Sequence, residues 1–227
     1  MGIITTKDHI KNVIDAMDKT IVVDSVVADG VNWKLNTTNT KWATYGKMLS
    51  GNLIKAVVFN ESITITATVE PSPGDYTLIA PFFYFGTFIE ANSELIKKKS
   101  SNVKYPLIYL HLNAPEKYAD EEATVDFESD CAIYFMVDCL PKNWVRNDHI
   151  EYAIKPMKQL RAEFIRSLFN YSKTNAANKI TFIENDYANF GTYEWKGEVK
   201  QTFADNISGT EILINIPWNK CMSCCEN

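Results

Sequence analysis

The strand that decides the fold reads CAIYFMVDC, residues 131–139. Its odd-numbered residues are all apolar, and so are the residues between them up to Met136. When one face of a strand is exposed to water, polar side chains normally alternate with apolar ones. A strand that is apolar on both faces is typical of a sheet that is covered on both faces. We therefore expect this strand to be buried on both sides.

Helical periodicity marks three segments around this strand. Thr5 and Asp8 have the spacing of a helix start, and they precede an amphipathic stretch. A second helix is expected between Gly86 and Lys99, and the longest one between Asp148 and Tyr171. Pro156 lies inside the longest helix and predicts a kink there, because proline has no backbone N–H to donate.

Extended segments make up the rest of the chain. Residues 21–85 are rich in β-branched residues and alternate with period two around Ile63. Residues 105–110 read as a strand that is entered through a proline, and residues 179–183 and 211–216 read as further strands near the end. The sequence therefore predicts many strands and few helices.

These elements predict a single α+β domain over residues 1–227. We expect a mixed or antiparallel sheet packed by two to three helices, with a possible β-rich insertion at residues 21–84. Residues 219–227 are predicted to be a flexible, cysteine-containing tail.

Composition excludes several classes of protein. The 227 residues are 46% apolar and 22% charged, which is typical of a folded chain and not of a disordered one. Apolar runs are much shorter than the ~20 residues of a membrane-spanning helix, and the first residues do not have the pattern of a secretion signal. The net charge of −5 argues against a protein that binds nucleic acid through its phosphates.

An acidic run at residues 116–130 is the clearest charge feature. It contains a single lysine among seven carboxylates. A solvated loop and a docking surface for a basic partner both predict such a run. The residues we expect at an interface or channel face are Glu116, Asp120, Glu121, Glu122, Asp126 and Glu128.

A search for catalytic or metal-binding motifs finds none. The three histidines, His9, His111 and His149, stand in separate elements, and no metalloprotease, nucleophile-elbow or phosphate-loop motif occurs. Cys221, Cys224 and Cys225 contain half of a zinc motif without a second half. We expect no enzyme activity, no catalytic residue, no metal site and no cofactor, with reduced cysteines.

Three segments follow one another in an order that resembles a known family. They are FGTFIEANSELIKKKSSNVKYPLIYLHLN at residues 85–113, the strand and helix region of residues 130–173, and GTEILINIPWNKC at residues 209–221. This order is similar to that of small neck proteins of tailed bacteriophages, the head–tail connector and tail-completion proteins, and most of all to ring proteins of crAss-like phages. The stretch at 21–84 is longer than the minimal connector fold of that family, which indicates an insertion, and the cysteine tail has no counterpart in that pattern.

The resemblance implies a structural role in the virion. Six or twelve copies would form a ring around the DNA channel in the neck, between the portal and the tail, after assembly in the cytoplasm of the host bacterium. The partners would be other copies, the portal and adjacent neck or tail proteins, with DNA passing through without sequence-specific binding and no membrane involved. A tail terminator or tail-tube adaptor is the nearest alternative. A small hydrolase with an unrecognised carboxylate site, and a monomeric adaptor domain, are more distant ones.

Overall fold

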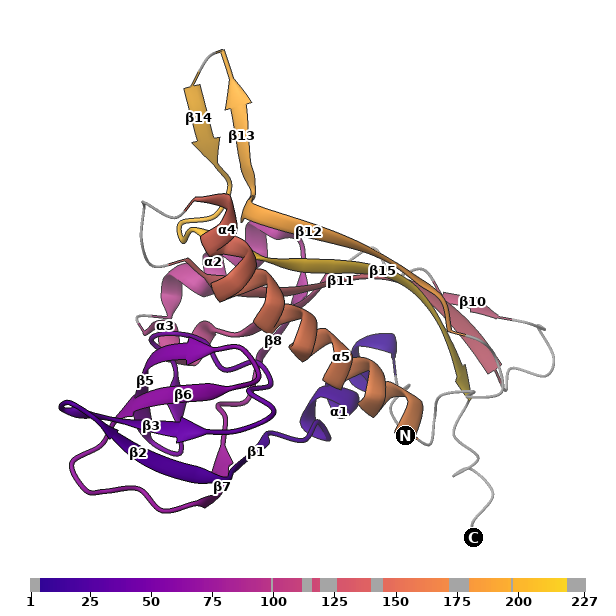
Figure 1. The fold of residues 1–227 in the computed structure, drawn as a ribbon. Coiled ribbons are helices and arrows are strands. Elements are labelled where there is room, and N and C mark those ends of the chain that lie inside the picture. The colour runs from indigo at the N-terminus through magenta and orange to yellow at the C-terminus, as the bar shows by residue number, and fades with distance from the viewer. Residues whose placement is uncertain are drawn as a thin grey trace, which may run out of the picture.

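The computed structural model describes residues 5–98, 100–111, 116–118, 126–139, 145–171, 180–196 and 198–219. The described part has the α+β fold that the sequence predicts (Figure 1). Most strands belong to a six-stranded sheet or to a five-stranded sheet, and helices cover the larger one. No helix among the described residues is long and apolar enough to cross a membrane.

The larger sheet has the strand order β12-β15-β11-β9-β8, and β10 pairs with β11 beyond the end of β9. Strands β11 and β15 are paired antiparallel over 13 residues each and form the spine of the sheet. Only the β8–β9 pair is parallel among the described pairs. The bounds are β8 Phe82–Gly86, β9 Leu107–His111, β10 Glu116–Tyr118, β11 Asp126–Asp138, β12 Phe182–Phe190 and β15 Ile207–Asn219.

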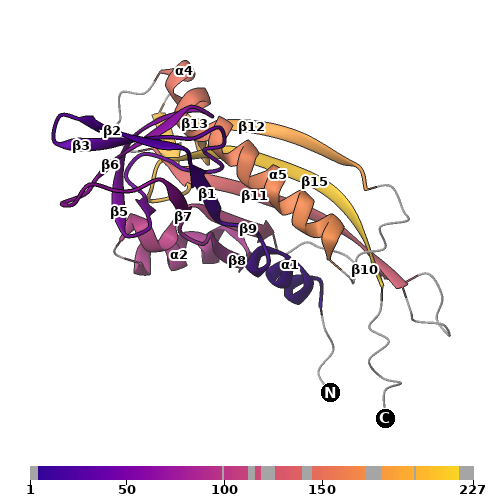
Figure 2. The ribbon, with the colours of Figure 1, turned by 60° about the horizontal axis from the view of Figure 1, so that its bottom comes forward.

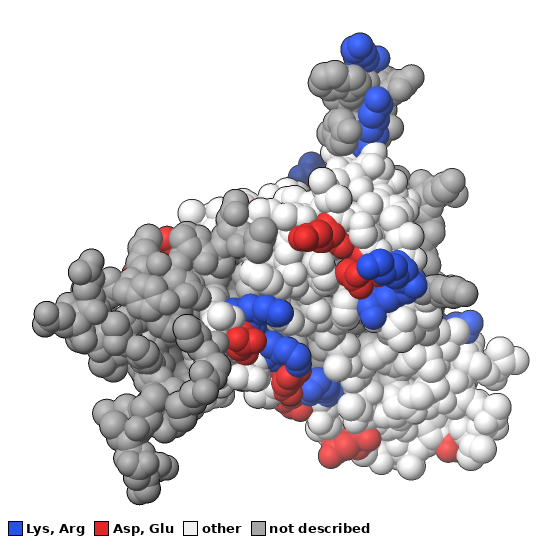
Figure 3. All heavy atoms as spheres, turned by 180° about the vertical axis from the view of Figure 1, so that it is seen from behind, with Lys and Arg blue, Asp and Glu red and all other residues white. Residues whose placement is uncertain are grey.

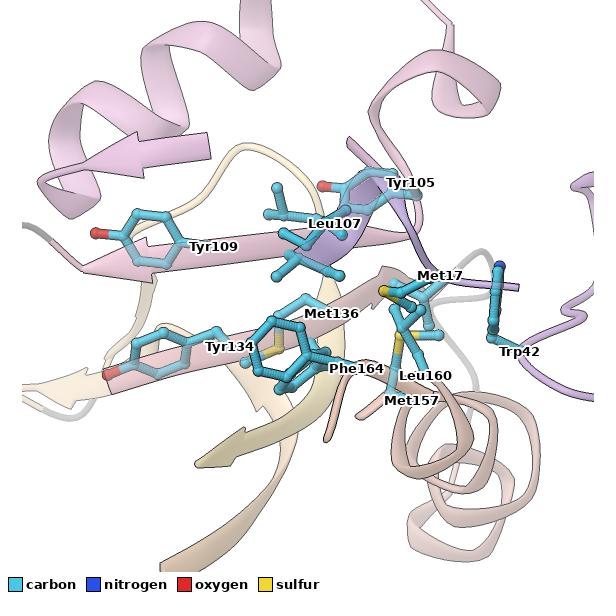
Figure 4. Close-up of a cluster of buried hydrophobic side chains, with 14 of the residues drawn as sticks. Met17, Trp42, Tyr105, Leu107, Tyr109, Tyr134, Met136, Met157, Leu160 and Phe164 are labelled. Atoms are coloured by element: carbon cyan, nitrogen blue, oxygen red, sulfur yellow. The ribbon is translucent and has the colours of Figure 1, made fainter. Parts of the chain in front are cut away.

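Helices cover β11 on both of its faces. On one face, Phe164 of α5 (Lys155–Asn170) meets Phe135 with ring centroids 5.5 Å apart. On the other face, Phe88 of α2 (Phe88–Lys97) meets Tyr134 at 5.6 Å. The close-up in Figure 4 shows Met157, Leu160 and Phe164 directed at β11. The prediction that this strand is buried on both sides is confirmed.

Of the remaining helices, α1 (Thr6–Asp15) contributes buried residues such as Ile10 and Val13 to the core, and α3 (Ser101–Lys104) and α4 (Arg146–His149) are short. Helix α1 begins as predicted: the Thr5 backbone N–H donates to Asp8 Oδ2 at 3.0 Å. It packs beside α5, as Figure 2 shows. Helix α3 precedes β9, and α4 runs into the π-helical turn η1 (Ile150–Ile154) and then into α5.

Residues 20–77 form smaller β-structures beside the large sheet. A five-stranded sheet has the order β2-β3-β6-β5-β4, and β1 pairs separately with β7. Leu35, Ile54 and Ile63 fill its interior with no exposed surface. The bounds are β1 Thr20–Val23, β2 Ser25–Asp29, β3 Asn32–Asn36, β4 Met48–Leu49, β5 Asn52–Val58, β6 Ser62–Thr66 and β7 Gly74–Thr77. The β-rich prediction is confirmed, whereas the idea that this region is an insertion stays a prediction.

Two local predictions differ from the structure. The longest helix starts earlier than Asp148, because the Asp148 carboxylate accepts the Val145 backbone N–H at 2.9 Å and caps α4. Pro156 follows the π-helical turn η1 near the start of α5, and the kink expected there stays a prediction. Parts of the predicted acidic loop are strand, since β10 pairs with Phe127–Ser129 of β11.

Candidate interaction surfaces

The β11–β15 ribbon has two distinct ends. At one end Asp126 lies opposite Asn219, and this end carries the acidic residues. At the other end Asp138 lies opposite Ile207, and the chain between β12 and β15 forms a hairpin there. This hairpin consists of β13 (Thr192–Trp195) and β14 (Glu198–Gln201) and projects away from the body (Figure 1). Thirteen residues at ~3.3 Å each place the two ends roughly 40 Å apart.

The acidic end contains only part of the predicted set. Glu116 lies in β10 opposite Ser129, and Asp126 and Glu128 lie in β11, where Lys117 of β10 is the residue opposite Glu128. Asp120, Glu121 and Glu122 lie outside the described residues. Glu128 is exposed. The described carboxylate positions therefore lie on neighbouring strands of one ribbon.

A buried polar cluster holds this end of the ribbon in place. Ser129 is fully buried; its Oγ is 2.6 Å from Thr6 Oγ1 of α1 and accepts the Trp218 indole N–H at 3.1 Å. The His9 ring stacks on Trp218 with centroids 4.8 Å apart. Ser129 is buried while Glu128 is exposed, which is the alternation of a strand. These contacts hold the backbone of β11 in place directly beside Glu128.

An apolar row crosses the sheet beside the acidic end. Ala132, Leu213 and Ile183 lie directly opposite one another on three neighbouring strands. Ile183 is 65% exposed and Leu213 is 42% exposed. A shallow hollow of about 460 Å³ lies over this row, and Asp130 and Asn215 line it too. Sequence reasoning missed this row, because the three residues come together only through strand pairing.

Next to the apolar row lies a buried carboxylate. Glu211 is 6% exposed and accepts the Tyr187 hydroxyl at 2.8 Å and the Asn185 amide at 3.0 Å. Burial, together with the nearby carboxylate, raises the pKa of Tyr187 to about 12. The Glu211 oxygens are held by neutral donors of the same sheet, so we interpret this group as part of the sheet's packing.

One cluster has the residue types of a nucleophile and a base. Ser208 Oγ is 2.9 Å from His149 Nδ1, accepts the Asn189 backbone N–H at 2.9 Å and accepts the Cys139 thiol at 3.0 Å. Ser208 is fully buried, and desolvation raises the pKa of the Cys139 thiol to about 11. A cavity of about 480 Å³ nearby is lined by His149 but by neither Ser208 nor Cys139. The cluster ties β11, α4 and β15 together.

A second buried network joins the two sheets. Lys47, which is 2% exposed, pairs with Asp138 at the end of β11 and donates to Ser101 Oγ. Burial lowers the pKa of Lys47, and the nearby Asp138 carboxylate counteracts this shift. Lys104 pairs with Asp205 at 2.6 Å beside it.

Figure 3 shows the charges that do reach the surface on the face opposite to the view of Figure 1.

Neither a metal site in the described residues nor a match to a known protein assigns a function to the chain. Within the described ranges, no group of three or more His, Cys, Asp or Glu side chains is placed to hold a metal ion, and the tail cysteines from Cys221 onward lie outside those ranges. No protein-family model matches the chain, and neither does any curated protein.

Proposed function

We propose that this chain is a structural subunit of the neck of a tailed bacteriophage, where copies form a ring around the DNA channel between the portal and the tail. The resemblance of residues 85–221 to neck proteins motivates the proposal. On this proposal the protein is part of the virion and acts without enzyme activity or cofactor.

The observation that carries the proposal is the pair of unlike ends on the β11–β15 ribbon. A closed ring is built from heterologous contacts, in which one surface of a copy meets a different surface of the next copy. The projecting β13–β14 hairpin and the acidic end are different surfaces roughly 40 Å apart by the ~3.3 Å rise per strand residue. A subunit with such ends can contact a neighbour on either side.

The charge of the chain supports a position around DNA. A wall that lets DNA slide through must not release many counterions from its phosphates, and such binding needs dense lysine and arginine. The chain carries a net charge of −5, and only three of its basic residues are arginine. The acidic end is our candidate for the channel face or for a contact with a neighbouring subunit.

Quantitative mass spectrometry of purified particles that encode this chain tests the proposal. We expect a constant copy number that is a multiple of six when it is measured against the portal protein of the same particles. A chain that is absent from mature particles would refute the proposed role. Particles stripped of their tails distinguish a neck ring, which stays with the head, from a tail terminator, which leaves with the tail.

A further inference from the structure

The five-stranded sheet has open edges at both ends of its strand order. Strand β2 is the terminal strand on one side, and it pairs only with β3 among the described strands. On the other side, β4 covers only Asn52 and Leu53 of β5. Residues 55–58 of β5 therefore present an edge without a neighbouring strand in the described structure. Open edges are templates for pairing with another chain.

The open edge of β5 forms one wall of a slot. The chain beside β5 stays close as far as Gly46, whose N–H donates to the Ile54 carbonyl at 2.9 Å. Beyond that point residues 43–45 diverge from β5. The space between them is a cavity of about 560 Å³, and Glu151, Tyr152 and Pro156 form its third wall.

A buried hydroxyl in the slot has no partner. Thr44 lines the cavity and is 4% exposed, and its Oγ1 makes no hydrogen bond within the described structure. Leaving a buried polar group unpaired costs free energy, so such groups normally have a partner. A segment that entered the slot with its own polar atoms would supply the missing partner.

The β2–β3 hairpin is a suitable occupant from a second copy. Its turn lies at the outer margin of the molecule in Figure 1. Val31 in the turn is 88% exposed and Val27 of β2 is 52% exposed. Asp29 is the sole charged residue of β2, so this edge has few of the charges that commonly protect edge strands.

The facing of the side chains permits only every second register. Val57 of β5 and Ala28 of β2 lie opposite residues of the interior-facing set, Ile63 and Trp33. An added antiparallel strand that continues the sheet keeps the same faces, and one register that does so places Ala28 opposite Val57. Val27 then lies opposite Val58, which is 48% exposed.

The same register brings opposite charges together. Asp29 of the incoming strand falls opposite Ala56, next to Lys55 at the irregularity in β5. Both charged residues are exposed. A pair of opposite charges across the contact favours this register over its alternatives.

We propose that β2 of one copy adds to the open edge of β5 in the next copy, with Asp29 beside Lys55 and the turn of the hairpin entering the slot near Thr44. The contact uses two different surfaces, so it continues from copy to copy and closes into a ring when the rotation allows. This inference rests on the proposed function, since it names one contact of the same assembly.

Charge exchange tests the contact in the full-length chain. Sedimentation velocity over concentrations up to the solubility limit should show self-association of the native chain, and Asp29→Lys or Lys55→Asp should each weaken it about tenfold or more. Mixing the two variants should restore association, because each contact then joins opposite charges. The exposed residues Asp75 and Lys11 supply matched controls, and Asp75→Lys and Lys11→Asp should have no effect.

Thr44→Val should affect the stability of the monomer and its self-association in opposite directions. It should keep or raise the melting temperature of the monomer, because an unpaired hydroxyl is removed, and it should weaken association. A native chain that stays monomeric at every concentration, or a mixture of the two charge variants that fails to associate, would overturn the inference. If particles contained a ring-like copy number of the chain but the charge variants associated normally, only this contact would be refuted. If the chain were absent from particles but the charge variants behaved as expected, only the neck role would be refuted.

Discussion

The strands of the two sheets are covered by helices and neighbouring strands to different degrees. In the larger sheet, β11 lies between helices on both faces and pairs with β15 over 13 residues. In the smaller sheet, the strands are two to seven residues long and both outer edges are open. The larger sheet is therefore the more enclosed part, and the smaller sheet is the part that leaves strand edges open for the contact proposed above.

The largest expected effect is at a glycine of the larger sheet. A Cβ on Gly209 would lie 1.9 Å from the Phe135 carbonyl oxygen of the paired strand, which is backbone and cannot move aside alone. Gly209→Ala should therefore cost more than about 4 kcal/mol, or prevent folding. Urea unfolding followed by circular dichroism measures the change.

Gly30 in the β2–β3 turn is the matched position in the smaller sheet. It has φ +62° and open space around the missing Cβ, so Gly30→Ala should cost about 1 kcal/mol through backbone strain alone. Equal losses at the two glycines would contradict the idea that the larger sheet is the tightly enclosed one.

The second effect concerns the buried pair that joins the sheets. Lys47→Met removes the partner of Asp138 and leaves a carboxylate in a mostly buried site, so we expect a loss of about 3–5 kcal/mol. Because an uncompensated charge causes most of this loss, adding Asp138→Leu should recover much of it. Equilibrium unfolding of the single and double variants measures both values.

An exposed pair provides the control for Lys47. Lys11 pairs with Asp15 at 2.6 Å on the surface of α1, and both side chains are more than half exposed. Lys11→Met should change the free energy of unfolding by less than about 1 kcal/mol. If the Lys47 variant lost no more than this, the buried pair would not hold the two sheets together.

The elements of the larger sheet could be predicted from the sequence, whereas their contacts could not. Apolar residues on both faces of residues 131–139 predict a covered strand, and the spacing of Thr5 and Asp8 predicts the start of α1, because both signals lie within one short segment. The group of Cys139, His149 and Ser208 spans 69 residues and depends on pairing between strands.

The candidate surfaces also divide into one that local sequence predicts and one that depends on long-range contacts. The acidic run was visible in the sequence, but the strand pairing of Glu116 with Ser129 was not. The slot beside β5 could not be predicted, because it arises where residues 43–45 leave the edge of a strand ten residues further along. Local composition therefore located one surface, and long-range pairing created the other.

A third, smaller effect is the loss of stability of the larger sheet at alkaline pH. The pKa of Cys139 is raised to about 11 by burial, so between about pH 9 and 11 the folded thiol keeps a proton that the unfolded chain has released. Stability should fall as pH rises through this window, by at most about 1.4 kcal/mol per pH unit. Denaturant midpoints from pH 8 to 10.5 measure this slope.

Two variants identify the titrating group that causes the loss of stability at alkaline pH. Cys139→Ala should lower stability at neutral pH but flatten the alkaline slope, since the titrating thiol is gone. Val137→Ala removes a side chain that is also buried on β11 and has no proton to lose, so it should lower stability equally at each pH. An unchanged slope in Cys139→Ala would assign the alkaline loss to the buried tyrosines, whose pKa values are also raised.

The smallest effect on stability, and the most direct test of the acidic end, comes from neutralising its carboxylates. The sequence predicts that the acidic run is solvated, and solvated charges contribute little to folding. Exchanging Asp120, Glu121, Glu122 and Asp126 for their amides should therefore change the free energy of unfolding by less than about 0.5 kcal/mol. Incorporation into particles should nevertheless fall, since a docking surface loses its attraction for a basic neighbour. Thermal unfolding and the copy number per particle are measured on the same preparation.

Neutralising an equal number of exposed carboxylates on the smaller-sheet region shows whether position or net charge matters. The control set is Asp24, Glu61, Glu70 and Asp75. Both sets change the net charge equally, so a general loss of solubility would affect both alike. Normal incorporation of the first variant would remove the acidic end from the list of contacts. The open edges of the smaller sheet would then have to carry the contacts between copies, a role that the Asp29 and Lys55 variants test independently.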